Sequence, residues 1–243
     1  MRFTFLIIFS LSAFFSKAQA PDSLNTARRC TYMTKEERDM ISEINLVRSN
    51  PQGYIQYIQP LLADARKELS RNGNGAKNYS ISTSTITENG LSTKTVDTTW
   101  HYINDENVKA LTSLIKDLTK LESLSVLKPD SGIYMAAKKH AADQHAHEWK
   151  LSHQGSDGSW PWDRISKYSP SMAYGNENIA MQSGSASVRD IVLLLLIDAG
   201  IPGYGHRSNM LAPQWTNVAC TTENYKSFYH WWLQEFGARM KKD

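Results

Sequence analysis

Apolar positions recur at helical spacing near the start of the chain. Within residues 34–58 they fall at Met40, Ile44 and Val47, which places them on one face of a helix. Pro51 interrupts this pattern, because proline disfavours the helical conformation of the residue before it. We therefore predict a helix over 34–58 that is interrupted after residue 50.

Most of the apolar and aromatic residues lie between residues 107 and 239. Three segments have helical periodicity and two have the aromatic content of strands: 108–118, 130–149 and 188–198, then 215–222 and 227–236. Helices that alternate with a late antiparallel pair of strands predict a layered α/β domain. We place one such domain at 34–240, after an N-terminal arm at 21–33.

The segment at about 66–101 has a different composition, because it is rich in serine, threonine and asparagine. We expect an insertion in the domain. Residues 81–87 and 92–98 are predicted to pair as a surface hairpin, and a disordered excursion is the alternative. Nothing in this segment suggests catalysis.

The first twenty residues are typical of a secretory signal peptide. Arg2 precedes an almost wholly apolar run, and Ala18-Gln19-Ala20 offers a signal-peptidase site. We expect cleavage after Ala20 and secretion to the extracellular space or the periplasm, as a chain that does not span a membrane. A retained membrane anchor is the alternative, although the apolar run is short for a bilayer.

The charge of the mature chain bears on its partners. Loss of the two cations Arg2 and Lys17 takes the formal net charge from +3 to +1. A nearly neutral chain lacks the basic surface that nucleic acid requires, so we expect no nucleic-acid partner.

Two cysteines, Cys30 and Cys220, remain in the mature chain. In an oxidising compartment a lone pair of cysteines predicts one disulfide. This bond would tie the N-terminal arm to the core, and the chain-entropy model gives it about 4–5 kcal/mol. Two buried free thiols are the alternative.

Four histidines lie close together in the sequence, but their spacings are five, two and six residues. Helical metal ligands prefer spacings of three or four, which put them on one face. We therefore interpret His140, His145 and His147 as helix-surface or interface residues. His153 differs, because it follows the predicted helix and precedes Gly155, where a side chain can point into a cleft.

Two later segments offer further candidate residues. Glu177 lies between two asparagines and just before an apolar pair, which favours the edge of a buried element; a helix cap or a structural hydrogen-bond hub is the alternative. His206 follows a glycine-rich turn, and Arg207 beside it could pair with a carboxylate. The chain has no GxSxG nucleophile elbow and no phosphate-binding glycine loop.

The aromatic residues Trp160, Trp162 and Tyr168 follow His153 in the sequence. A ligand platform is one interpretation of them. Packing in a lid or in the core is the interpretation that we favour.

Taken in order, three motifs resemble the CAP superfamily (cysteine-rich secretory proteins, antigen 5 and pathogenesis-related 1 proteins), and its bacterial extracellular SCP-like branch in particular. They are Leu151-Ser152-His153, Gly175-Asn176-Glu177-Asn178-Ile179-Ala180 and Gly205-His206-Arg207-Ser208-Asn209-Met210-Leu211. The resemblance implies an α-β-α sandwich with a small antiparallel sheet between helical layers. It also implies a cleft lined by two histidines, His153 and His206, and by two acids, Glu177 and Asp198.

The two neutral imidazoles of His153 and His206 would suit a divalent metal ion, and zinc is the ion that we expect. Three hypotheses follow. The first is a secreted module that binds such an ion together with an extracellular or envelope ligand, for example a lipid or sterol. The second is a metal-assisted hydrolase of peptide or cell-wall bonds. The third is an interaction protein whose His/Glu network is purely structural. We assign no catalytic residue, because the sequence shows no clear nucleophile.

Overall fold

The computed structural model describes residues 22–75, 77–88, 91–102, 105–147, 151–183, 186–225 and 229–240. The expected signal peptide at 1–20 and its cleavage site lie outside these residues. Within them, no helix is both long and apolar enough to cross a membrane.

A four-stranded sheet forms the centre of the body, with the order β3-β5-β6-β4. Its strands are β3 (Lys128–Pro129), β4 (Met172–Ser183), β5 (Asn217–Tyr225) and β6 (Tyr229–Arg239). The long strands pair antiparallel, and only the short β3 runs parallel to β5. The two predicted strands correspond to β5 and β6, whereas β4 was not anticipated. This edge strand carries Glu177 at its middle.

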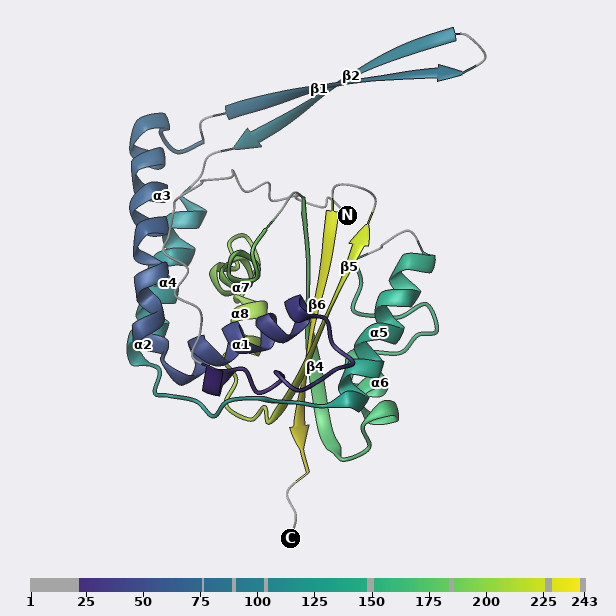
Figure 1. Cartoon of the computed structure of the whole chain (residues 1–243). Coiled ribbons are helices and arrows are strands. Elements are labelled where there is room, and N and C mark those ends of the chain that lie inside the picture. The colour runs from purple at the N-terminus through teal and green to yellow at the C-terminus, as the bar shows by residue number, and fades with distance from the viewer. Residues whose placement is uncertain are drawn as a thin grey trace.

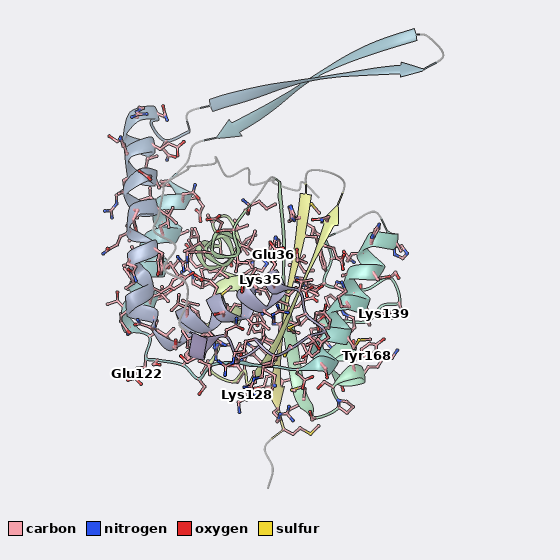
Figure 2. The ribbon with its side chains drawn as sticks, viewed as in Figure 1. Lys35, Glu36, Glu122, Lys128, Lys139 and Tyr168 are labelled. Atoms are coloured by element: carbon pink, nitrogen blue, oxygen red, sulfur yellow. The ribbon has the colours of Figure 1, made fainter. Side chains whose placement is uncertain are left out.

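Helices cover both faces of the sheet, as Figure 1 shows. One layer contains α1 (Lys35–Ser49), α7 (Val188–Ile197) and α8 (Gly205–Met210), and the other contains α5 (Ser131–Ala146) and α6 (Pro161–Tyr168). In Figure 2, Lys139 and Tyr168 lie on the α5–α6 layer, and Glu122 lies at the opposite side of the body. The predicted α-β-α sandwich is therefore confirmed.

The start of α1 and its end follow from local sequence. Thr34 accepts a hydrogen bond from the backbone of Glu37, whose side chain accepts one from the backbone of Thr34, so a capping box begins the helix. At Asn50 the chain leaves α1, and Pro51 occupies the first turn of α2 (Pro51–Tyr54). A 3-10 turn (Ile55–Tyr57) completes this stretch. The predicted interruption after residue 50 is confirmed.

Two further helices and a long hairpin lie outside the sandwich (Figure 1). They are α3 (Gln59–Asn72), α4 (Glu106–Lys120), β1 (Lys77–Glu88) and β2 (Leu91–Tyr102). The antiparallel pairing of β1 with β2 joins residue 81 to 98 and residue 87 to 92, which is the predicted hairpin. The helix α3 continues to Asn72, so the first residues of the Ser/Thr/Asn-rich segment at about 66–101 are helical.

The expected Cys30–Cys220 disulfide is absent, and both thiols are free. Cys220 is fully buried in β5, and burial raises the pKa of its thiol well above the ordinary range. Hydrogen bonds hold the N-terminal arm in place of the expected bond. Asn45 of α1 donates to the backbone oxygen of Leu24 (3.0 Å) and to the hydroxyl of Thr26 (3.2 Å).

Candidate functional site

Glu177 lies at the centre of a buried polar cluster on the α5–α6 side of the sheet. Its side chain is completely buried. Oε1 lies 2.8 Å from Nδ1 of His153, and Oε2 accepts a hydrogen bond of 2.8 Å from Nη2 of Arg164. A buried carboxylate requires such partners, because it has lost its hydration. Glu177 is thus paired with one permanent cation and one imidazole.

Arg164 of α6 joins the loop before that helix to β4. Besides Glu177, it donates through Nη1 to the backbone oxygens of His153 (3.2 Å) and Ser159 (2.9 Å). These hydrogen bonds fix the position of the backbone at His153. That side chain is 46% exposed, so the ring is held at Nδ1 and faces solvent elsewhere.

His140 belongs to the same cluster, which corrects its interpretation as a helix-surface or interface residue. Its side chain is fully buried, with Nε2 3.7 Å from Glu177 Oε1 and 2.9 Å from the backbone oxygen of Ser152. Burial lowers the pKa of His140, which favours the neutral ring. His145 and His147 are exposed, as predicted. The missed signal is that His140 shares the helix face of Ala137 and Gln144.

A second histidine–carboxylate pair forms where α7 ends. Asp198 caps that helix in the left-handed conformation, with φ of 55°. Its Oδ1 lies 2.7 Å from Nδ1 of His206, and its Oδ2 accepts a 2.8 Å hydrogen bond from the backbone N–H of the same residue. The turn between Asp198 and His206 therefore fixes both the backbone and the ring of His206.

The edge strand β4 contacts the residues of both pairs. Neighbouring residues of a strand point to opposite faces of the sheet. Glu177 faces α6, whereas Asn178 faces α8, where it donates to the backbone oxygen of His206 (3.1 Å). Each histidine thus has its own buried carboxylate, Glu177 for His153 and Asp198 for His206. In the described part of the chain, no three His, Cys, Asp or Glu side chains are grouped so that they could hold a metal ion.

Arg207 has a different role from its neighbour His206. As predicted, it pairs with a carboxylate, that of Asp117 in α4 (2.9 Å). It also donates to the backbone oxygens of Leu196 (2.7 Å), Ile197 (2.9 Å) and Ala110 (3.0 Å). Arg207 therefore joins α8 to the end of α7 and to α4, and its side chain is buried.

Trp160 and Trp162 form an exposed aromatic pair beside the start of α6. Their rings stack at a centroid distance of 5.4 Å with an interplanar angle of 6°. They are 40% and 46% exposed, so packing in the core is wrong for this pair, whereas packing in a lid stays a prediction. Tyr168, at the end of the same helix, is half-buried. The indole pair follows the loop of His153 in the chain and lies at the start of α6, the helix that carries Arg164.

Comparison with known proteins supports the resemblance. The family "CAP: Cysteine-rich secretory protein family" matches residues 112–236, a range that includes His153, Glu177 and His206. Similar solved structures include an outer surface protein from Borrelia burgdorferi, which is 24% identical. That match covers 58% of this chain and 98% of the other, with a TM-score of 0.42.

Another similar structure is an extracellular protein containing a SCP domain from Bacillus anthracis str. Ames, which is 21% identical. The match covers 59% of this chain and 47% of the other, with a TM-score of 0.37. A comparison with curated proteins finds no match. Because the family match covers more than half of the sequence, this chain belongs to the cysteine-rich secretory protein (CAP) family.

Proposed function

We propose that this CAP protein acts outside the cell as a binding protein. It holds a divalent metal ion, preferably zinc, through His153 and His206, and it also binds an extracellular or envelope ligand. One observation carries the proposal. Both histidines have Nδ1 against a buried carboxylate, at 2.8 and 2.7 Å, and both side chains are partly exposed. A carboxylate at Nδ1 fixes the tautomer in which Nε2 is the unprotonated nitrogen.

The donor set defines what kind of metal site these residues would make. Imidazole nitrogen is a preferred ligand of zinc, and a carboxylate behind the imidazole makes it more basic. Glu177 and Asp198 are engaged behind the rings, so the protein would supply two ligands and leave positions for water or a bound molecule. We therefore expect modest affinity. The extracellular location is part of the proposal and rests on the family and on the expected signal peptide.

Zinc binding tests this proposal directly. Titration calorimetry on metal-stripped protein comprising residues 21–243 is expected to give saturable binding. His153→Ala and His206→Ala should each weaken it by about tenfold or more. The matched control is His147→Ala, which removes an exposed histidine of the α5–α6 layer and should leave affinity unchanged. Absence of binding by the unmodified protein would refute the metal site.

The indole pair suggests the chemistry of the second ligand. Exposed aromatic surface next to a polar site is suited to lipid, since indole packs on apolar chains and keeps its N–H near water. With phosphatidylcholine vesicles, with or without a sterol, we expect co-sedimentation to weaken roughly tenfold on replacing Trp160 and Trp162 by serine, as the loss of buried apolar area predicts. The control is Met135→Ser, which removes another exposed apolar side chain. Equal loss in the control would exclude the indole pair as the lipid contact.

Hydrolysis is the alternative outcome of these experiments. Zinc-dependent turnover of a peptide or cell-wall substrate, abolished by Glu177→Gln in a folded protein, would replace the binding role with an enzymatic one. We favour binding because the exposed indole pair at the start of α6 offers a contact surface for a second ligand.

A further inference from the structure

A second glutamate lies directly opposite Glu177 in the sheet. Glu235 of β6 pairs with Glu177 of β4 in the antiparallel register. Opposed residues of neighbouring strands place their side chains on the same face, only about 5 Å apart at Cβ. Both side chains are fully buried. The sheet thus holds two carboxyl groups together out of contact with water.

The groups around Glu235 do not supply enough positive charge for two carboxylates. Arg164 of α6 faces both glutamates, with Nε 3.9 Å from Glu235 Oε1. His140 of α5 lies beyond Glu177 and is neutral, as its lowered pKa indicates. From β5, the residue opposite Glu235 is the uncharged Ala219. Two buried carboxylates that share one arginine repel each other, which favours retention of one proton.

Hydrogen bonding indicates which carboxyl keeps that proton. Glu177 has partners for both oxygens, His153 and Arg164. No described residue donates a hydrogen bond to either oxygen of Glu235. If both groups were ionised, each would be an acceptor only, and no bond could form between them. A proton on Glu235 turns that group into a donor, and Glu177 is the acceptor within its reach.

We infer that Glu235 is a protonated carboxylic acid at neutral pH and that it donates a hydrogen bond to Glu177, which makes it a positioning residue for the Glu177–His153 pair. Burial in the first place, and then the charge of Glu177, raise the pKa of Glu235 well above its ordinary range. This inference goes beyond the proposed function and needs no metal, so it is tested on metal-stripped protein and can fail independently of zinc binding.

Infrared spectroscopy detects the proton itself. At neutral pH the folded protein should show the carbonyl-stretch band of a neutral carboxylic acid, and Glu235→Gln should remove it. The band should persist in Glu223→Gln, a control in β5 whose side chain is 35% exposed and paired with Lys138. A missing band in the unmodified protein, or a band that Glu177→Gln removes and Glu235→Gln leaves, would overturn the inference.

The positioning role has its own signature. The Nδ1 proton of His153 should give a downfield proton NMR signal in the unmodified protein and in Glu235→Gln, since the amide of glutamine can replace the donor. Glu235→Leu keeps the buried apolar volume but has no donor, so the signal should be lost or shifted upfield. An unchanged signal in Glu235→Leu would exclude a positioning role.

Stability against pH gives an independent measurement. The native pKa of Glu235 is raised, so the native state holds a proton that the unfolded chain releases above about pH 4.3. The folding constant of the unmodified protein, relative to that of Glu235→Gln, should be constant below that pH. It should fall by up to about tenfold per pH unit above it, until the native group ionises. A ratio that does not change with pH would contradict the inference.

Discussion

Replacing Arg164 with glutamine is expected to lower the free energy of unfolding by about 3–5 kcal/mol, the range typical of removing one partner of a buried ion pair. The arginine side chain is 5% exposed and is the cation paired with the fully buried Glu177. Its removal leaves that carboxylate in a low-dielectric interior without a permanent cation, where only hydrogen bonds from neutral partners such as His153 remain. Urea denaturation at neutral pH, followed by circular dichroism, measures the loss.

Two variants establish that the loss comes from the uncompensated charge. Lys167→Gln makes the same charge change on an exposed residue of α6 and should have little effect. Combining Arg164→Gln with Glu177→Gln should recover part of the loss, because no carboxylate is then left without its cation. If the two losses simply add, the ion pair is not the source of stability at this position.

Replacing Arg207 with methionine should have an effect of similar size for a different reason. This buried arginine donates mainly to backbone oxygens, those of Leu196, Ile197 and Ala110. Methionine fills much of the space but offers no donor, so three carbonyl groups lose a partner. The oxygen of Ala110 keeps its helical partner inside α4, whereas those of Leu196 and Ile197, at the end of α7, do not. An unsatisfied buried acceptor costs roughly 1–3 kcal/mol, so the two predict a total loss of about 2–6 kcal/mol. Urea denaturation under the same conditions measures it.

The matched control for Arg207 is its own carboxylate partner. The Asp117 side chain is 51% exposed, so Asp117→Asn should change the unfolding free energy only slightly. For the same reason, adding Asp117→Asn to Arg207→Met should not rescue stability, in contrast to the pair Arg164 and Glu177. A loss in Asp117→Asn as large as that in Arg207→Met would show that the ion pair, and not the carbonyl contacts, holds α8.

Local sequence predicts the elements whose ends or faces carry their own signals. The capping residues and Pro51 define α1 and its end, and the aromatic content of 229–239 indicates β6. The strand β4 lacks such a signal, because Glu177 and Asn178 make both of its faces polar at the centre. It also contains Gly175, which has low strand propensity; an added Cβ there would lie 2.4 Å from Ile165 Cδ1. Close packing of α6 on β4 therefore explains why β4 contains Gly175, although glycine in the sequence argues against a strand.

The site was only partly predictable for a related reason. The motifs of the sequence include His153, Glu177 and His206. The roles of Arg164 and Glu235, in contrast, depend on contacts with residues that are distant in the chain. Glu235 becomes a candidate only when the β4–β6 register is known, since that register sets it against Glu177. The pairing of two strands that are distant in the chain cannot be predicted from the periodicity of a single sequence.

The base of the β1–β2 hairpin has a consequence for how this chain tolerates change. The backbone N–H of Asp105, just before α4, donates to the side chain of Asn74, just after α3, over 3.2 Å. The two ends of the insertion are therefore one hydrogen bond apart, and α3 already packs against α4 below them. When the two ends of a loop are held together, the entropy cost of closing the loop rises only slowly with the number of residues in it. We therefore expect that the hairpin can be lengthened, shortened or replaced with little change in the stability of the body that carries it.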